Sequence, residues 1–274
     1  MEKFLEGKGA LITGGASGFG KGVALAFAER GADLVLVDIN EELLIETSNQ
    51  VARETGRKVI PIICDVSKSD QVDAMVKQAF NELDNIYVLF NNAGIGTSFG
   101  KHILRIKEAD WDKIMDVNLK GQWLVAKACW RKMKAQEFED EELSGKMIHT
   151  TSAAAYLKNP NLPLYSLSKV GIKAMVEIMA KSLAPKISVN AIAPGFHVTG
   201  IYLNDEETLR TAMRHAKAKI PLIRLGTIGD VVDLVVFIAS PQCNYITGHC
   251  FPIDGGISEV GRGGGNLKWE KFEY

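Results

Sequence analysis

A tyrosine and a lysine stand four positions apart in the segment YSLSK, residues 165–169. If this segment is helical, the side chains of Tyr165 and Lys169 lie on one face and can come close together. A free tyrosine has a pKa of about 10, so proton transfer near pH 7 needs a shift of roughly 3 units, about 4 kcal/mol. A nearby fixed cation favours the phenolate and shifts the pKa in that direction. The pair therefore fits an acid/base catalyst, although an exposed helix pair has the same spacing.

A glycine-rich turn, TGGASGFG, separates the first apolar run from a segment of helical period. Gly14, Gly18 and Gly20 stand where backbone N–H groups and the helix dipole can bind a pyrophosphate. Their G-x-x-x-G-x-G spacing differs from the G-x-G-x-x-G dinucleotide fingerprint. A tight turn between a strand and a helix has similar glycines, so the turn alone does not identify a cofactor site.

Asp38 ends the second apolar run, twenty residues after Gly18. A carboxylate at this place can accept hydrogen bonds from an adenosine ribose, and it repels a 2′-phosphate. The turn between Thr13 and Gly20 contains no Arg or Lys to offset that repulsion. An Asp after a strand is also common as a helix cap. Taken together, the glycine turn and Asp38 predict that NAD, rather than NADP, is the cofactor.

Strand-like apolar runs alternate with segments of helical period along the chain. The runs are GALIT, DLVLVDI, KVIPIICDV, NIYVLFNNAG, KMIHTTS and ISVNAIAPG. Near-continuous apolar strands that alternate with helices indicate an α/β fold with a parallel sheet covered on both faces. The sequence has no linker rich in Pro or Ser and no internal repeat beyond this alternation, so we expect one domain over residues 1–274.

Four further segments carry expectations of their own. A long helix is expected from about 109 to 135, followed by a solvated acidic loop at 136–145. Residues 196–228 contain a helical pattern, EETLRTAMRHAKAK, and are expected to form a substrate-binding lobe. The tail at 258–274 begins with glycines and ends with aromatic residues, so it either packs on a homo-oligomer or frays.

Composition indicates an ordinary globular protein, with 46% hydrophobic and 24% charged residues. A net charge of −1 gives no electrostatic reason to expect binding to nucleic acid or to an anionic membrane. The sequence has no apolar run of membrane-spanning length and its first residues do not form a signal peptide, which predicts a cytoplasmic protein. The cysteines lack C-x-x-C spacing, so we expect buried free thiols and no metal site at Cys64, Cys129, Cys243 and Cys250.

Taken together, the glycine turn, the NNAG at 91–94 and the YSLSK resemble the short-chain dehydrogenase/reductase family. Further matches over roughly residues 5–257 are Asp65, Asn118 in DVNLKG, Ser152, PGFHVT and ITGHCFPIDGG. The resemblance implies a Rossmann fold with a doubly wound sheet of about seven parallel strands, and a homotetramer or homodimer. It also implies hydride transfer between a nicotinamide and a carbonyl or alcohol. The acidic loop and the tail depart from the family pattern, which weakens a substrate assignment by analogy.

The same resemblance assigns roles to individual residues. Tyr165 resembles the general acid/base, and Lys169 the cation that lowers its pKa and holds the nicotinamide ribose. Ser152 is similar to the hydroxyl that polarises the substrate carbonyl, and Asn118 to the asparagine that orders a relay water, although either could instead only satisfy backbone groups. The cofactor-binding residues that the resemblance implies are Gly14, Ser17, Gly18, Phe19, Gly20, Asp38, Ile39, Asp65, Val66, Asn92, Ala93, Gly94, Tyr165, Lys169, Pro194, Gly195 and Thr199.

These features favour an NAD-dependent enzyme that interconverts a secondary alcohol and a ketone. One alternative is a 3-oxoacyl thioester reductase, although many such enzymes resemble NADP users; another is a non-catalytic NAD sensor, which has no need of Tyr165 and Lys169. Polar and aromatic residues near the motifs suit a sugar, a polyol or a hydroxy acid as substrate. The candidates for this pocket are Ser152, Tyr156, Lys158, Asn159, His197 and Tyr202.

Overall fold

The computed structural model describes residues 2–96, 102–139, 141–198, 210, 213–214, 216 and 218–260. It contains a seven-stranded sheet in the order β3-β2-β1-β4-β5-β6-β7, and all neighbouring strands are parallel. The strands are β1 (Gly9–Thr13), β2 (Asp33–Asp38), β3 (Val59–Ile63), β4 (Val88–Asn91), β5 (Gly145–Thr150), β6 (Ile187–Pro194) and β7 (Cys250–Ile253). The predicted Rossmann-like, doubly wound sheet is confirmed.

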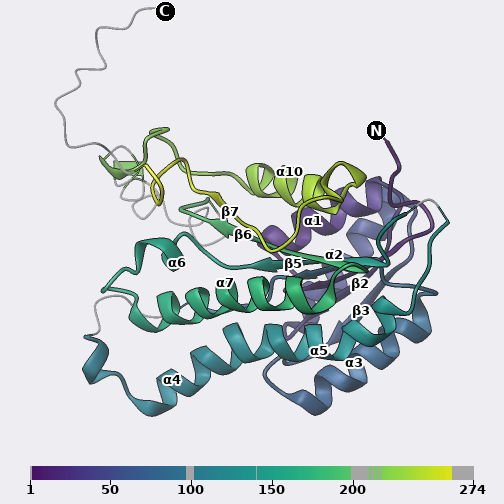
Figure 1. Ribbon diagram of the computed structural model, residues 1–274, viewed down its shortest axis with the longest axis horizontal. Helices are drawn as coiled ribbons and strands as arrows, with labels where there is room; N and C mark the ends of the chain where they lie inside the picture. Colours follow the sequence, from purple (N-terminus) through teal and green to yellow (C-terminus); the bar gives the residue numbers. More distant parts are fainter. Residues whose placement is uncertain are drawn as a thin grey trace, which may run out of the picture.

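Helices cover both faces of this sheet (Figure 1). One layer consists of α1 (Gly18–Glu29), α2 (Glu41–Thr55) and α10 (Ile228–Ala239). The other contains α3 (Ser69–Glu82), α5 (Gly121–Lys134) and α7 (Pro163–Leu183). Successive strand side chains point to opposite faces, so in β1 Ile12 packs with the first layer and Leu11 with the second. Burial on both faces explains why the strands read as continuous apolar runs.

The strand order reverses between β1 and β4, because β2 and β3 continue from β1 to one side while β4 to β7 continue to the other. In open parallel sheets, ligands bind at such a switch point, beyond the carboxyl ends of the strands. The glycine turn follows β1, Asp38 is the last residue of β2, and Asn92 follows β4. Ser152 lies two residues after β5. The fold therefore collects the predicted motifs along one edge of the sheet.

The long helix expected at 109–135 is interrupted in the structure. It consists of α4 (Glu108–Met115), a π-helical turn (Asp116–Lys120) and α5. A π turn inserts an extra residue into the helical register, and such turns are frequent at functional sites. The apolar periodicity continues across the segment and does not indicate this turn, which contains Asn118.

The acidic loop at 136–145 is not simply solvated. The Glu141 side chain is only 4% exposed and forms an ion pair with Lys8. Its second oxygen accepts a hydrogen bond from the Tyr87 hydroxyl at 2.9 Å. Burial alone would raise the pKa of Glu141, but the hydrogen bonds from Lys8 and Tyr87 hold it below its usual value. Glu141 thus ties the loop to the chain before β1 and to the residue before β4.

Other expectations have mixed outcomes. The cysteines are free, with Cys250 half-buried and the other three buried. Among the described residues no helix is long and apolar enough to cross a membrane. Only part of the expected lobe at 196–228 is described, including an isolated bridge between His197 and Gly226. Most of the helical pattern EETLRTAMRHAKAK, and the tail from 261 to 274 with its aromatic end, lie outside the described residues.

Candidate active site

The glycine turn has a geometry that side chains would prevent. Gly14 and Gly18 have positive φ angles of 67° and 53°, and a Cβ on Gly20 would lie 1.9 Å from the Gly14 carbonyl oxygen. Ser17 is the N-cap of α1, yet its side chain makes no capping bond, and the first turn of α1 contains no acidic residue. The first N–H groups of α1 are therefore available to an anion.

A cavity of about 400 Å³ lies beside this turn, between the ends of β2, β3 and β4. Seven of the predicted cofactor residues line it, namely Gly14, Asp38, Ile39, Asp65, Val66, Ala93 and Gly94. Lys68 and Lys113 also line the cavity, and neither was predicted from the sequence. Lys68 stands three residues after Asp65, which was a possible signal, whereas Lys113 comes from a distant helix. A glycine turn, a helix start and a carboxylate at the end of β2 around one cavity fit a dinucleotide.

Two carboxylates organise the cavity wall. Asp38 accepts backbone hydrogen bonds from Ala16 at 3.2 Å and from Asn40 at 3.1 Å, so it joins the glycine turn to the start of α2. Asp65 accepts hydrogen bonds from the backbone and hydroxyl of Ser67 at 2.9 and 2.7 Å. Burial alone would raise the pKa of Asp65, but the Ser67 hydrogen bonds hold it below its usual value. Asp65 is therefore ionised at neutral pH.

Thr13 fixes the NNAG segment against β1. Its hydroxyl donates to Asn91 Oδ1 at 3.2 Å and accepts from the backbone N–H groups of Asn92 and Ala93 at 2.9 and 3.1 Å. The Asn92 side chain donates to the Thr13 carbonyl at 3.2 Å and accepts from the Thr150 hydroxyl at 3.1 Å. Asn92 thus sets the backbone of the cavity wall. Thr13 was not among the predicted site residues, although it is the last residue before the glycine turn.

Tyr165 and Lys169 both lie on α7, which begins at Pro163, as the spacing of the YSLSK motif predicts. Lys169 Nζ lies 5.4 Å from the centre of the Tyr165 ring. It donates a hydrogen bond to the Thr150 carbonyl at 3.0 Å. The Ser152 hydroxyl, which follows β5, accepts a hydrogen bond from the Ala154 N–H at 3.1 Å and is close enough to the Tyr165 side chain to lower its pKa. The structure therefore brings the predicted tyrosine, lysine and serine together.

The electrostatics of this group differ from the expectation for a phenol beside a cation. Burial raises the pKa of Tyr165, and the hydrogen bond with Ser152 only partly opposes that effect. Burial also lowers the pKa of Lys169 to about 8. Both shifts arise because the interior disfavours the charged form of each group. At neutral pH the site thus holds a neutral phenol next to an ammonium, a state in which the phenol can donate a proton.

Asn118 closes the site on the side of the π turn. Its Oδ1 accepts from the Ile95 N–H at 2.7 Å, and its Nδ2 donates to the Ile95 carbonyl at 2.9 Å and to Ser168 Oγ at 3.2 Å. A Cβ on Gly94 would lie 3.2 Å from Asn118 Oδ1 and 3.6 Å from Lys169 Nζ. Asn118 and Lys169 therefore meet at Gly94. The side chain of Asn118 satisfies the backbone of another segment rather than of its own helix.

Two of the residues predicted near the substrate take part in internal contacts. The Tyr156 hydroxyl donates to the Cys250 carbonyl at 2.9 Å, which joins α6 (Ala154–Leu157) to β7. His197 is 5% exposed and packs edge-on against Phe19 of the glycine turn, with the ring centres 5.4 Å apart. A Cβ on Gly226 would lie 2.3 Å from the His197 ring, so this contact requires glycine.

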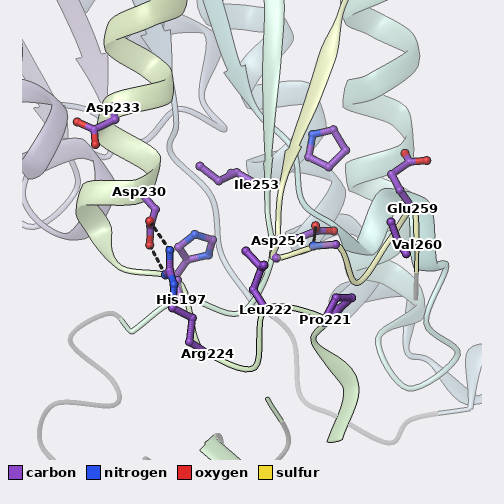
Figure 2. A pocket seen from close by; sticks show the side chains of 14 residues that line it. His197, Pro221, Leu222, Arg224, Asp230, Asp233, Ile253, Asp254, Glu259 and Val260 are labelled. Carbon is purple, nitrogen blue, oxygen red and sulfur yellow. Dashed lines mark hydrogen bonds and ion pairs between the residues drawn. The ribbon is translucent and has the colours of Figure 1, made fainter. Parts of the chain in front are cut away.

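His197 also borders a second cavity of about 720 Å³, shown in Figure 2. Leu222 and Ile253 contribute to its wall, and the Arg224–Asp230 ion pair lies on the His197 side. Pro194 ends β6, and Gly195 donates its N–H to the Ile253 carbonyl at 3.0 Å. Lys158 and Asn159 follow α6 on the surface. Thr199 and Tyr202, also predicted at the site, lie outside the described residues.

Within the described part of the chain, no group of three or more His, Cys, Asp or Glu side chains could hold a metal ion. The described side chains bring together a phenol, an ammonium and a hydroxyl, which are groups that can transfer a proton and stabilise charge. The neighbouring cavity is suited to a dinucleotide.

The chain is similar to known proteins over most of its length. Residues 14–258 match the family model described as enoyl-(acyl carrier protein) reductase. The chain is 37% identical to the 3-oxoacyl-[acyl-carrier-protein] reductase of Thermotoga maritima, over 92% of this chain and 98% of that protein. It is similar to the structure of NAD+-bound xylitol dehydrogenase (TM-score 0.83, 30% identity, 93% and 100% of the two chains). It is also similar to L-sorbose reductase from Gluconobacter frateurii, complexed with NADPH and L-sorbose (TM-score 0.86, 25% identity, 94% and 99% covered).

Proposed function

Because the chain belongs to the short-chain dehydrogenase/reductase family, we propose that it is an NAD(H)-dependent oxidoreductase that interconverts a secondary alcohol and a ketone. The observation that carries this proposal is the placement of Tyr165, Lys169 and Ser152 at the edge of the sheet that also holds the Asp38 cavity. Gly94 links the two, because it lines the cavity and a Cβ on it would lie 3.6 Å from Lys169 Nζ.

The side chains have distinct tasks in the reaction. When bound, the nicotinamide coenzyme supplies or takes up the hydride. Tyr165 donates its phenol proton to the oxygen that becomes the alcohol, and it accepts that proton in the reverse direction. The Ser152 hydroxyl stabilises the negative charge that develops on this oxygen. The Lys169 ammonium stabilises the phenolate that remains on Tyr165 after proton transfer.

NAD is the proposed cofactor because of the Asp38 carboxylate. The glycine turn would hold the pyrophosphate, Asp38 the adenosine ribose, and Asp65 and Val66 the adenine. Similar proteins use either cofactor, since one related structure contains NAD+ and another NADPH. Lys68 and Lys113 in the same cavity are the residues that would favour a 2′-phosphate. The charge of Asp38 is therefore the feature on which the choice depends.

We propose a small polyhydroxylated or hydroxy-acid substrate, for which the similarity to xylitol dehydrogenase and L-sorbose reductase is the support. Among the described residues, we propose that Ser152 and His197 face this substrate. A second candidate is reduction of a 3-oxoacyl thioester, which the 37% identity to the Thermotoga maritima enzyme favours. We further propose one catalytic domain, a cytoplasmic location and, as the family resemblance implies, a homotetramer or homodimer.

Oxidation of NADH and NADPH by the purified protein, measured with sugar ketones, 3-oxo acids and a 3-oxoacyl thioester, tests these proposals. The expected result is turnover with NADH and a small polar ketone, and loss of turnover in Tyr165→Phe. Tyr245→Phe is the matched control, because the Tyr245 side chain is fully exposed and should tolerate loss of its hydroxyl. Binding of NADH without turnover of any compound in the panel would favour the NAD sensor instead.

A further inference from the structure

A buried glutamine and a buried histidine lie behind the proposed catalytic lysine. Gln122 is the second residue of α5 and is 1% exposed, and His149 lies in β5 and is fully buried. His149 Nδ1 and Gln122 Oε1 are 2.9 Å apart. Neither residue belongs to the predicted site, and neither lines the dinucleotide cavity. Two large polar side chains at such depth need their hydrogen bonds, because an unpaired polar group in the interior costs about 1–3 kcal/mol.

The Gln122 side chain also bonds the backbone oxygen that anchors Lys169. Gln122 Nε2 donates to the Thr150 carbonyl at 3.1 Å, and Lys169 Nζ donates to the same oxygen at 3.0 Å. In the β4–β5 register Asn91 lies opposite His149, and β4 ends there, so Thr150 lies beyond that ladder. Side chains, rather than β4, therefore hold this carbonyl.

The hydrogen-bond directions along the pair follow from chemistry. Gln122 Oε1 is an acceptor, so His149 Nδ1 carries the proton that it donates. His149 Nε2 then bears a lone pair, and it has no partner in the described structure. Burial lowers the pKa of His149 to about 4, so the ring stays neutral at neutral pH. Donation thus runs in one direction, from His149 to Gln122 and from Gln122 to Thr150.

The backbone of Gln122 is fixed as well. Its carbonyl accepts a hydrogen bond from Asn91 Nδ2 at 2.7 Å, and Asn91 in turn accepts from the Thr13 hydroxyl. Gln122 is therefore held at both its main chain and its side chain. A residue held in this way can fix the position of what it contacts.

We propose that Gln122 and His149 are positioning residues for the reaction: Gln122 fixes the Thr150 carbonyl that anchors the Lys169 ammonium beside Tyr165, and His149 fixes Gln122. This inference rests on the proposed function, in which Lys169 stabilises the Tyr165 phenolate. The groups that face Lys169 are Tyr165 on its own helix, the Thr150 carbonyl from β5 and the Asn118–Gly94 contact from the π turn.

Gln122→Met tests the proposal, because methionine has a similar shape but no amide. We expect kcat for alcohol oxidation to fall by about 3- to 30-fold, as for the loss of one positioning hydrogen bond. The acidic limb of its pH profile should move upward by about 0.5 to 1 pH unit, because a displaced ammonium stabilises the phenolate less. KM for the alcohol should stay within twofold, since neither residue faces the substrate.

His149→Leu tests the same hydrogen bond from the histidine side, because it removes the N–H donor to Gln122. His149→Gln restores an N–H donor and should recover part of the kcat that His149→Leu loses. The double variant of Gln122→Met and His149→Leu should be no worse in kcat than Gln122→Met, because both changes break one chain. Asn190→Leu is the matched control, since Asn190 is buried in β6 and bonds Ile246 and His249. It should lower thermal stability and leave the pH profile unchanged.

Crystal structures of Gln122→Met and His149→Leu give a measurement that does not require activity. The expected result is that Lys169 Nζ no longer lies within hydrogen-bond distance of the Thr150 carbonyl. An unchanged Lys169 position, an unchanged acidic limb, or an equal shift in Asn190→Leu would overturn the positioning role. A wild-type protein that turns over no ketone or alcohol would refute the proposed function instead, and the crystal structures would still decide whether Gln122 positions Lys169.

Discussion

Replacement of Asp38 by Asn isolates the charge that we expect to select NAD. Asp38 accepts backbone hydrogen bonds from Ala16 and Asn40 through different oxygens. Asn keeps one oxygen acceptor and a similar shape, whereas Ala would also release the glycine turn from the start of α2. The Asn variant therefore removes the charge with the least disturbance of the cavity.

The expected effect follows from the distance over which the two charges act. Unit charges about 4 Å apart interact by about 4 kcal/mol at the effective dielectric near a protein surface. Asp38 is half-exposed, so solvent and salt reduce this to about 1–2 kcal/mol. The ratio of kcat/KM for NAD to that for NADP should therefore fall by about 5- to 30-fold in Asp38→Asn.

The assay compares initial rates with NADH and NADPH at low and high salt. Glu41→Gln is the control, because Glu41 is an exposed acid in the first turn of α2 that does not line the cavity. Lys113→Met removes a positive charge of the cavity wall that opposes the effect of Asp38, and it should weaken any use of NADPH. The reasoning about Asp38 is refuted if the unmodified protein uses NADPH as well as NADH, or if Asp38→Asn leaves the ratio within twofold.

Three further predictions concern proton transfer and stability. Tyr165→Phe should lower kcat at least about 1000-fold while NADH, titrated by fluorescence, still binds within a few-fold of wild type. Burial raises the pKa of Tyr165 and lowers that of Lys169 to about 8. The rate of ketone reduction should therefore be sustained near pH 7 and decline above pH 8, whereas the rate of alcohol oxidation should rise. A reduction rate that increases above pH 8 contradicts this prediction. Glu141→Leu leaves Lys8 and Tyr87 without their partner and should cost about 3–5 kcal/mol. By circular dichroism the Tm of Glu141→Leu should fall by at least about 6 °C, and by more than the Tm of Glu141→Gln. Identical melting curves for Glu141→Leu and the wild type would show that the Lys8–Glu141 ion pair contributes nothing to stability.

The architecture could be predicted from the sequence because the central strands of the sheet are buried on both faces. That burial requires continuous apolar runs, so β1 and β2 are visible as GALIT and DLVLVD. Asp38 and Ser152 lie at one edge of the sheet because the carboxyl ends of parallel strands share that edge. The roles of these two residues stay predictions.

What the sequence did not reveal depends on partners that are distant along the chain. Gln122 reads as an ordinary polar helix residue, and its partner in β5 is 27 positions away. Glu141 reads as part of a solvated acidic loop, yet its partner Lys8 is 133 positions away. Neither pairing follows from spacing or from apolar periodicity. The direction of the Tyr165 pKa was also missed, since it depends on burial, which a pair of residues in a motif does not specify.

Buried polar side chains at this edge of the sheet connect the wall of the proposed cofactor cavity to α7, which holds Tyr165 and Lys169. Thr13 binds Asn91, Asn91 binds the Gln122 main chain, and the Gln122 side chain binds the carbonyl that anchors Lys169. A fully satisfied network in the interior is rigid, whereas a partly satisfied one is costly. The hydrogen bonds that hold the NNAG segment against β1 are therefore continuous with those that hold Lys169 of α7. The position of Lys169 relative to the NNAG segment is thus set by buried side-chain hydrogen bonds as well as by strand pairing. We therefore expect a conservative change at Gln122 to alter that position without contacting the cofactor or the substrate.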